Sequence, residues 1–129
     1  METQLFPKGE QAPADYFVGM AWVKSLVPAD AIWNTSIAHV SFEPGSRNNW
    51  HQHSGGQILI VTSGTCFFQE KGKPKQIYKA GEVIKIAPGV MHWHGASADA
   101  AMTHLAVNTN TQKGLVDWME KVTDEEYDS

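Results

Sequence analysis

Two histidine pairs, His51 with His53 and His92 with His94, carry the clearest chemical signal in this 129-residue sequence. Residues i and i+2 of a β-strand point to the same face, so each pair presents two imidazoles side by side. Two such pairs brought together can supply three or four nitrogen ligands, which suits Mn, Fe, Co, Ni, Cu or Zn. Each pair also lies beside a glycine-containing turn. The pattern therefore predicts a centre for a divalent transition metal.

Gln57 is the next candidate ligand. It follows His53 after Ser54-Gly55-Gly56, and the two glycines permit a bend that turns its side chain back toward the histidines. Three neutral imidazoles and a neutral amide leave the double positive charge of a metal ion uncompensated. We expect such an ion to bind an alkoxide or another anionic oxygen readily, as a Lewis acid. The alternative is that Gln57 occupies this position without binding metal.

His94 and His104 are candidate bases. His104 and Asn108 share one face of the segment 102–108, and they reach the same cavity as His94 if that face points inward. An imidazole close to a cation has a lowered pKa and stays neutral, ready to accept a proton at neutral pH. For His104, orienting a metal ligand is the alternative role.

Glycine and proline interrupt the chain regularly from residue 44 to residue 89. Between them lie short segments rich in β-branched and aromatic residues. Short strands separated by turns every ~8–12 residues are typical of an all-β sandwich or barrel. The strands are expected at residues 37–42, 57–62, 65–69, 82–86 and 102–108, with a hairpin loop at 70–74.

One segment, 114–121, has the spacing of a helix. Leu115, Trp118, Met119 and Val122 follow the i, i+3, i+4, i+7 pattern of an amphipathic helical face. A short C-terminal helix is therefore expected there. The acidic residues 123–129 after it are expected to lie on the surface or to fray.

The composition points to a small-molecule partner. The net charge is -4 and the ten lysines and arginines are scattered, which argues against nucleic acid as a partner. No run approaches the ~18 apolar residues of a membrane helix, and the N-terminal residues contain no apolar core of a signal peptide. Cys66, the single cysteine, cannot form an intrachain disulfide, which suits a reducing compartment. We therefore expect a cytoplasmic protein with no membrane partner.

The spacing of these residues resembles the two motifs of the cupin family. The first motif consists of Gly45, five residues, His51-x-His53, three residues, Gln57, six residues and Gly64, with Gln57 where Glu is usual. The second consists of Gly81, five residues, Ala87-Pro88-Gly89, two residues and His92, with Ala87 where proline is usual. The resemblance implies a double-stranded β-helix, or jelly-roll, barrel with a metal inside near one mouth. The ligands it implies are His51, His53, Gln57 and His92.

Further segments are similar to a bacterial cupin subgroup. It includes the manganese-dependent hydroxynitrile lyases and cupins associated with carboxymuconolactone decarboxylase domains. In those lyases the positions matching His94 and His104 serve acid–base chemistry, and by this reading Ala38 and Val40 line the substrate pocket beside Asn108. The resemblance implies a lyase that breaks a C–C bond next to a metal-bound hydroxyl and releases an aldehyde or ketone plus cyanide. The similar segments are residues 13–19, 42–45, 92–96, 102–106 and 116–127.

Two other functions stay open at this point. A metal-dependent oxygenase would use the same ligands with iron, although the loss of the usual acidic ligand disfavours it. A non-enzymatic binding module would hold a small ligand or a metal. Manganese is the metal expected from the resemblance, with Fe, Ni, Zn or Co as alternatives.

The whole chain, residues 1–129, is expected to form one cupin domain. The expected parts are an N-terminal arm at about 1–35, a barrel at about 36–110, and a C-terminal helix and tail at about 111–129. Apolar residues of the arm could complete the sheet of a neighbouring copy, which predicts a homodimer or a dimer of dimers.

Residues beside the candidate site are assigned other roles. His39 has the opposite parity to Val40, so it is expected to point outward as a surface or interface residue. Arg47 either guards the mouth of the barrel or pairs with an acid. Trp50 and Trp93 flank the histidines with opposite parity and are expected to pack on the outer face.

Overall fold

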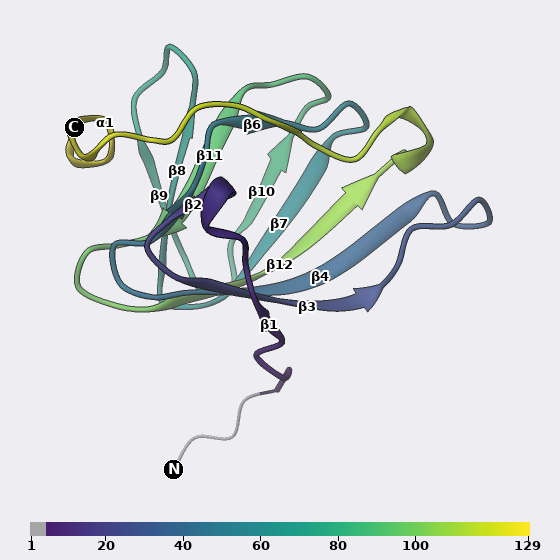
Figure 1. Cartoon of the computed structure of the whole chain (residues 1–129), viewed down its shortest axis with the longest axis horizontal. Helices are drawn as coiled ribbons and strands as arrows, with labels where there is room; N and C mark the ends of the chain where they lie inside the picture. The colour runs from purple at the N-terminus through teal and green to yellow at the C-terminus, as the bar shows by residue number, and fades with distance from the viewer. Residues whose placement is uncertain (1–4) are drawn as a thin grey trace.

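The long strands form one antiparallel sheet, and their side chains point alternately into and out of the barrel. In β12, for example, Met102, His104 and Ala106 are buried while the residues between them are partly exposed. The chain is described here by a computed structural model that covers residues 5–129. Its first sheet, which contains the long strands, has the order β1-β3-β4-β12-β7-β10 (Figure 1). The strands are β1 (Glu10–Gln11), β3 (Ala21–Val27), β4 (Thr35–Phe42), β12 (Met102–Thr109), β7 (Gln57–Ser63) and β10 (Val83–Ile86).

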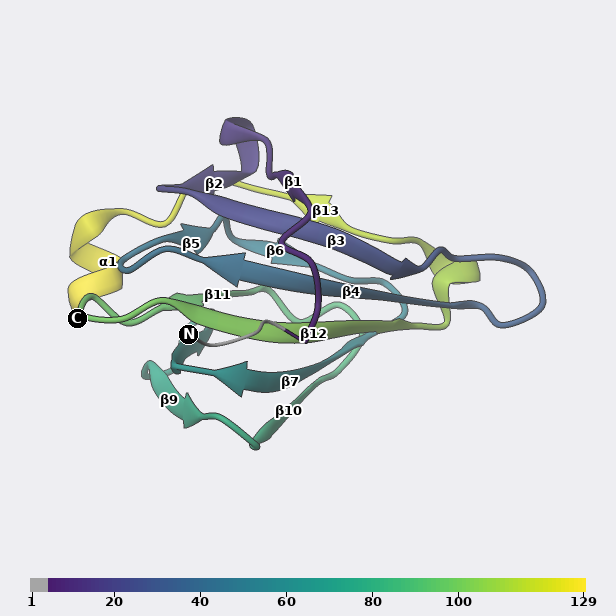
Figure 2. The ribbon, with the colours of Figure 1, turned by 90° about the horizontal axis from the view of Figure 1, so that it is seen from below.

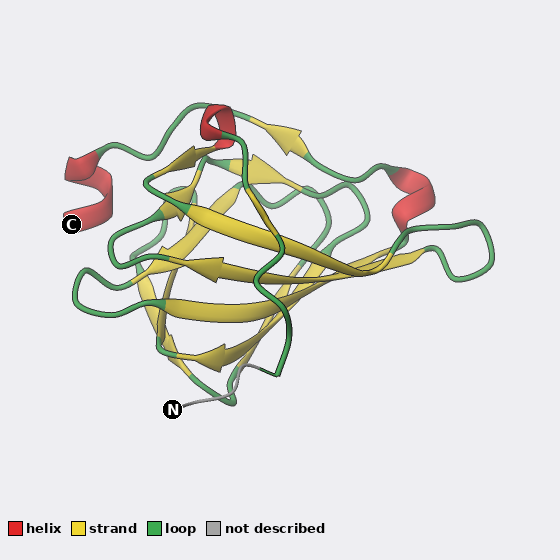
Figure 3. Cartoon of the chain, turned by 60° about the horizontal axis from the view of Figure 1, so that its bottom comes forward, coloured by secondary structure: helices red, strands yellow, loops and turns green. Residues whose placement is uncertain are grey.

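The second sheet faces the first and consists of shorter strands. Its order is β13-β6-β11-β5-β2, and β8 and β9 join it because β8 pairs with β11 and with β9. Figure 3 shows the strands of both sheets enclosing a barrel, with the helical turns at its rim. The strands are β13 (Asp117–Trp118), β6 (His51–Gln52), β11 (His92–Ala96), β5 (Arg47–Asn48), β2 (Phe17–Val18), β8 (Thr65–Glu70) and β9 (Gln76–Lys79).

Apolar side chains from both sheets fill one part of the barrel interior. Burying them removes apolar surface from water, which is the dominant favourable term in folding. Figure 2 shows β3, β4, β12 and β7 side by side in the first sheet. The largest members of this core include Phe42, Leu59, Val61, Phe68, Ile84, Ile86 and Met102.

The all-β barrel and the predicted strands are confirmed. Each of the segments expected at 37–42, 57–62, 65–69, 82–86 and 102–108 lies on one of the strands β4, β7, β8, β10 and β12. The hairpin loop expected at 70–74 connects β8 to its partner β9. In residues 5–129, no helix is long and apolar enough to cross a membrane.

The helix predicted at 114–121 is wrong. Residues 115–123, called the C-terminal strap below, contain no helix and run along the barrel, and β13 within them pairs with β6. The amide of Met119 donates to the carbonyl of Trp50 at 2.8 Å, and the amide of Trp50 donates to the carbonyl of Glu120 at 3.0 Å. These long-range hydrogen bonds satisfy backbone groups that a helix would have paired internally, so tertiary contacts override the helical spacing.

A short C-terminal helix does form, but it begins further along the chain. The residues expected to fray contain α1 (Asp124–Asp128), which starts at a capping box. The hydroxyl of Thr123 accepts from the amide of Glu126 at 3.1 Å, and the carboxylate of Glu126 accepts from the amide of Thr123 at 2.9 Å. This reciprocal pair satisfies two amides of the first turn.

The outer face of the second sheet carries a separate apolar cluster. Trp50 and Trp93 pack there with Val122 and Tyr127, as the parity of the two tryptophans predicts. His39 also points outward, but it is 5% exposed and its ring lies 5.0 Å from that of Phe6. The expectation of a surface histidine is therefore wrong, because the N-terminal segment covers this position.

Candidate metal centre

Three of the predicted ligands meet inside the barrel. His51 on β6 lies directly opposite His92 on β11, and His53 follows β6 by one residue. One nitrogen from each ring lies within 4.8 Å of the others. All three side chains are buried. Two adjacent strands and the turn after one of them thus bring the imidazoles together, as the His-x-His spacing predicts.

The backbone determines which nitrogen of each ring faces the centre. The Nδ1–H groups point to carbonyl oxygens, at 2.7 Å from His51 to Asn49, 2.5 Å from His53 to Leu115 and 2.9 Å from His92 to Val90. A carbonyl oxygen only accepts, so Nδ1 carries the proton and Nε2 keeps its lone pair in each neutral ring. Three Nε2 lone pairs therefore converge.

Gln57 adds an oxygen to this set. Its amide nitrogen donates to Oδ1 of Asn108 at 2.9 Å, which directs Oε1 inward. The Nδ2 of Asn108 donates in turn to the hydroxyl of Ser36 at 3.1 Å, so the orientation of Asn108 is set as well. Oε1 of Gln57 then lies 3.3 Å from Nε2 of His92.

The four side chains fit a bound cation. Oε1 of Gln57 and Nε2 of His92 are both acceptors, and no proton lies between them in the tautomer fixed by Val90. The Nε2 of His53 is buried without a hydrogen-bond partner among the described residues. Buried acceptors left in this way cost about 1–3 kcal/mol each. A divalent transition metal satisfies all of them at once, because imidazole nitrogen and amide oxygen are ligands for such ions.

The ligand histidines are neutral at ordinary pH. Burial lowers the pKa of His92 to about 4. Burial, followed by the charges of His92 and His53, holds the pKa of His51 well below its usual value. Burial also lowers the pKa of His53, against the opposing effects of the Leu115 carbonyl and Asp117. Neutral rings are the form that binds metal, so protons do not compete for the site until the solution is acidic.

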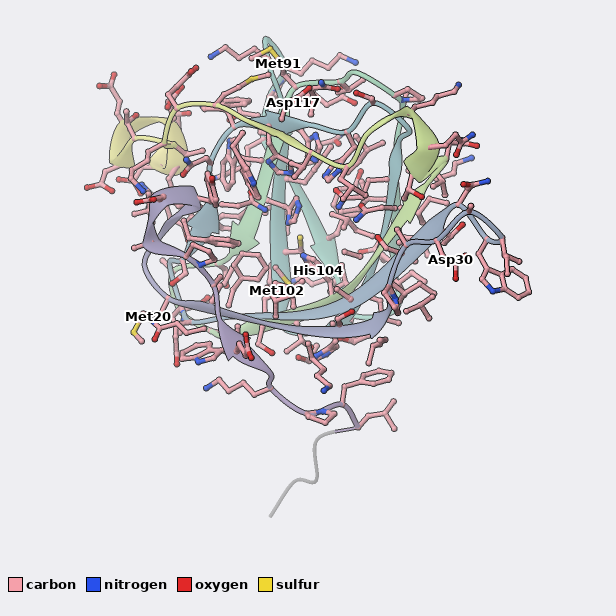
Figure 4. All side chains as sticks on the ribbon, turned by 45° about the vertical axis from the view of Figure 1, so that its right-hand side comes forward. Met20, Asp30, Met91, Met102, His104 and Asp117 are labelled. Carbon is pink, nitrogen blue, oxygen red and sulfur yellow. The ribbon has the colours of Figure 1, made fainter. Side chains whose placement is uncertain are left out.

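A second histidine pair lies beside the ligands. The ring of His94 is 5.4 Å from that of His51 and 5.7 Å from that of His92, centroid to centroid. Nε2 of His104 lies 3.1 Å from Nδ1 of His94. Figure 4 shows His104 pointing into the barrel interior together with Met102.

Asn48 fixes the protons of this pair. Its Oδ1 accepts the backbone amide of His94 at 2.9 Å, so its Nδ2 must donate to the ring. Of the two ring nitrogens, Nε2 lies closer to this Nδ2, at 3.1 Å, and Nδ1 lies at 3.3 Å next to His104. Nε2 of His94 is therefore the acceptor and Nδ1 carries the proton, which it donates to Nε2 of His104. The result is a chain of hydrogen bonds through two neutral rings.

Burial keeps both rings of this pair uncharged. It lowers the pKa of His104 to about 3, with a further contribution from the charge of His39. Burial, then the charge of His104, holds the pKa of His94 well below its usual value. A neutral imidazole has a lone pair that can accept a proton.

The predicted pocket residues share the inner face with these groups. Val40 on β4 is directly opposite His104 on β12, and Ala38 is directly opposite Ala106. Opposed residues of an antiparallel pair point to the same side of the sheet, so Val40 and Ala38 face the interior beside His104. Asn108 does so too, although its side chain is engaged with Gln57.

Arg47 lies on the other side of the sheet from the histidines. Its guanidinium donates to the carbonyl of Val122 at 2.7 Å and to the carboxylate of Asp124 at 2.8 Å. It also lies over the ring of Tyr127, at 4.7 Å from the centroid. Of the two roles considered for Arg47, the structure has the pairing with an acid.

Several groups that shape the site have no clear sequence signal. The carbonyls of Asn49, Val90 and Leu115 set the tautomers of the ligands, and any residue type can supply a carbonyl. Asn48 precedes the first histidine pair by three residues, which is the one feature that could have drawn attention to it. The ring of Trp118 lies 4.8 Å from that of His51. The predicted helix at 114–121 gave no reason to expect this contact.

Comparisons with known proteins identify relatives of this chain by sequence and by fold. The family model described as a cupin domain matches residues 38–108. An (R)-mandelonitrile lyase of Granulicella tundricola is 44% identical over 117 residues, which cover 91% of this chain and 89% of the relative. A crystal structure of a cupin-like protein from Thermotoga maritima matches 97% of this chain and 95% of that chain, with 46% identity and a TM-score of 0.94. An oxalate oxidase matches 92% of this chain and 63% of its own, but at 20% identity and a TM-score of 0.69 it shows the fold alone.

Proposed function

The chain belongs to the cupin domain family, and we propose that it is a metal-dependent lyase that cleaves the C–C bond beside a hydroxyl group, with a cyanohydrin as substrate. The observation that carries the proposal is the convergent set of three imidazoles and one amide beside the neutral pair His94–His104. Its similarity to a relative named (R)-mandelonitrile lyase supports this substrate class. Manganese is the metal we propose, from the resemblance of the sequence to manganese-dependent cupins.

The proposed metal supplies Lewis acidity toward an oxygen of the substrate when it is bound. Three neutral imidazoles and a neutral amide, with no carboxylate among them, leave that positive charge uncompensated. His51, His53, Gln57 and His92 hold the ion. The same positive charge would stabilise an alkoxide and so lower the pKa of a substrate hydroxyl beside it.

His94 is the proposed base. A substrate hydroxyl that replaces the Nδ2 of Asn48 would donate to the same lone pair on Nε2. As Nε2 gains the proton, Nδ1–H of His94 is already hydrogen-bonded to Nε2 of His104, so the positive charge is shared along that 3.1 Å contact.

The bonds and charges of the reaction balance without an oxidant or reductant. The hydroxyl oxygen loses its proton to His94 and forms the carbonyl of an aldehyde or ketone. The C–C bond breaks, and its electron pair leaves with the carbon of cyanide. Cyanide takes up the proton, which regenerates the neutral histidine and gives hydrogen cyanide. Ala38 and Val40, which face the interior beside His104, would contact the aryl or alkyl group of the substrate.

The test combines metal analysis with an assay of mandelonitrile cleavage. We expect one divalent metal per chain and release of benzaldehyde and cyanide. His94→Ala should keep the metal and lose at least about 100-fold in kcat/KM, the usual contribution of a positioned base. His39→Asn, which removes a histidine from the outer face, is the matched control and should retain full activity.

Other results would identify other functions. Oxygen consumption with iron bound and no cyanide release would replace the lyase by an oxygenase. Stoichiometric metal with neither activity would leave a metal-binding or ligand-binding cupin. Protein purified without metal and unable to take it up, with His51→Ala no different from the wild type, would overturn the metal centre itself.

A further inference from the structure

The C-terminal strap, residues 115–123, crosses the barrel next to the candidate metal centre. Figure 1 shows the chain passing over the edge of the barrel beside β6 before it reaches α1, and Figure 4 shows Asp117 of the strap at the same edge. The strap contains no predicted ligand and no acid or base of the proposed reaction. Its contacts nevertheless converge on the residues that hold the metal.

Two contacts join the strap directly to ligands. The carbonyl of Leu115 accepts the Nδ1–H of His53 at 2.5 Å, and this is the bond that keeps the Nε2 lone pair of His53 directed at the centre. Trp118 lies opposite His51 in the β13–β6 pair, with its ring 4.8 Å from the imidazole. One histidine thus depends on the strap for its tautomer and the other for the packing of one side of its ring.

The strap also supports the strand that carries His51. That strand, β6, has two residues and lies between β13 and β11 in the sheet. Without β13 it would be the edge of the sheet, with unpaired backbone groups on one side. The amides of Met119 and Trp50 extend this pairing beyond β13, through their bonds to Trp50 and Glu120.

Asn49 links the strap to the hydrogen bond that orients the ring of His51. Its carbonyl accepts the Nδ1–H of His51 at 2.7 Å, while its side-chain amide donates to the carbonyl of Met119 at 3.1 Å. The same residue therefore sets the tautomer of His51 and holds the strap. A displacement of the strap would change the position of this carbonyl.

The far end of the strap has its own anchor. Arg47 on β5, itself buried, binds the carbonyl of Val122 and the carboxylate of Asp124. The same nitrogen of the guanidinium, Nη2, donates to both acceptors, and a charge-assisted bond from a buried arginine to a backbone carbonyl restricts the chain more strongly than an exposed ion pair does. The strap is thus held near its start by the contact of Leu115 to His53 and at its far end by Arg47, with the contact of Trp118 to His51 between them.

We propose that the C-terminal strap is a positioning element of the metal centre, and that docking of the strap and binding of the metal are coupled. The inference rests on the proposed metal site. Leu115 and Trp118 act through His53 and His51, so they are positioning residues and touch no substrate. Coupling between two events is reciprocal: a loosened strap weakens metal binding, and a bound metal tightens the strap by the same factor.

The affinity for Co²⁺ alone, measured by competition with a chelator, tests the first half of this statement. Trp118→Ala should weaken binding by about 10–100-fold, the range found when groups that orient metal ligands are lost. Trp118→Phe keeps an aromatic ring against His51 and should restore most of the affinity. Trp33→Ala is the matched control, because Trp33 is 70% exposed and lies outside the strap.

Asp124→Ala extends the test to a residue that is distant from the ligands. The side chain of Asp124 is 91% exposed, so its loss should leave the protein folded even if Trp118→Ala does not fold. We expect a smaller weakening of Co²⁺ binding, of about two- to fivefold, since Arg47 keeps its bond to Val122. The inference would be overturned if both Asp124→Ala and Trp118→Ala bound Co²⁺ with unchanged affinity. If Trp118→Ala does not fold, unchanged affinity in Asp124→Ala is enough to overturn it.

Hydrogen exchange of the amides of Met119 and Trp50 tests the reverse direction. Saturating Co²⁺ should slow the exchange of these two amides in the wild type. The expected factor equals the ratio of the Co²⁺ affinities of the protein with the strap docked and with the strap loosened. The effect should be absent in Trp118→Ala. A wild type that binds no Co²⁺ would refute the metal site, whereas a wild type that binds it without protecting these amides would refute the coupling and leave the site intact.

Discussion

At the scale of single residues, hydrogen bonds around the candidate centre determine which atom each side chain presents to it. Backbone carbonyls hold the proton on Nδ1 of His51, His53 and His92, and Asn108 holds the amide of Gln57 with its oxygen inward. A ring or an amide turned the other way would present a donor, which a metal cannot use. Orientation, as much as residue type, makes these four side chains one acceptor set.

Gln57→Glu tests the importance of the uncharged ligand. A carboxylate in this position would cancel part of the charge of the ion, so we expect tighter metal binding and a weaker Lewis acid. Metal affinity should rise about tenfold, equivalent to about 1.4 kcal/mol, while kcat for mandelonitrile falls by a similar factor. Gln112→Glu adds the same charge at an exposed position and should change neither value. Equal or faster turnover in Gln57→Glu would contradict this account.

His104 should make the metal-free protein sensitive to acid. Its pKa falls from the ordinary 6.5 to about 3 on folding, so below pH 6.5 the unfolded chain binds a proton there that the native state does not. Its contribution is complete above that pH, and it is lost as the pH falls from about 6.5 toward 3, at up to about 1.4 kcal/mol per pH unit. His104→Asn should therefore lose stability less steeply.

Urea unfolding of both metal-free proteins between about pH 7 and pH 5 measures this difference. The other five histidines are common to the two proteins, so the difference in slope reports His104 together with its effect on the pKa of His94. Two parallel curves would show that His104 is protonated in the native state as readily as in the unfolded chain.

Among the elements of the fold, the turn between His53 and β7 has the tightest geometry near the site. Gly56 has a φ of 88°, in the left-handed region. A Cβ on Gly55 would collide with the carbonyl oxygens of Thr109 and Asn110. The turn therefore packs its backbone against the end of β12, which brings Gln57 to the centre beside Asn108. Glycine is required at 55 for space and at 56 for conformation.

Gly55→Ala should displace this turn. The clash is with backbone atoms, which cannot rotate away, so we expect a loss of roughly 2–3 kcal/mol in the free energy of unfolding together with weaker metal binding. Gly72→Ala is the control for a glycine in a hairpin, since its Cβ would meet nothing within 4 Å although its φ is 83°. It should cost only about 1–2 kcal/mol of backbone strain and leave metal affinity unchanged. Equal metal affinity in the two variants would contradict the role given to Gly55.

For the molecule as a whole, the metal centre joins the two sheets. Gln57 belongs to the first sheet, with the long strands, while His51 and His92 belong to the second. A bound ion would connect strands that otherwise contact each other through side-chain packing. Since the unfolded chain has no preformed site, binding energy adds directly to the stability of the fold.

Metal removal should therefore lower the melting temperature. At a free metal concentration of 100 times Kd, binding contributes about 2.7 kcal/mol. For a chain of 129 residues this corresponds to a shift of roughly 10 °C. Calorimetry of the protein with excess metal and after chelation measures the shift, and His51→Ala should show none. An equal shift in His51→Ala would assign the bound metal to some other site.

Local patterns in the sequence were sufficient to predict the barrel strands and the three histidines that cluster inside the barrel. Parity within a strand and turns at glycine and proline involve residues only a few positions apart, so β7 and β12 could be located without knowing what they pack against. The His-x-His pairs are local in the same sense. The prediction of a helix at 114–121 was wrong because it used only the local spacing of apolar residues. The backbone partners of this segment lie on and beside β6, far away in the sequence.

The tertiary structure alone decided which atoms face one another. The bond from Asn48 to His94 joins residues 46 positions apart, and the one from His53 to Leu115 joins residues 62 positions apart. No pattern of residue types records such contacts, since the first depends on a pairing of distant strands and the second on a backbone carbonyl that every residue possesses. The sequence thus determined the set of chemical groups, and the pairing of the sheets determined their protons, their orientation and the strap that holds them.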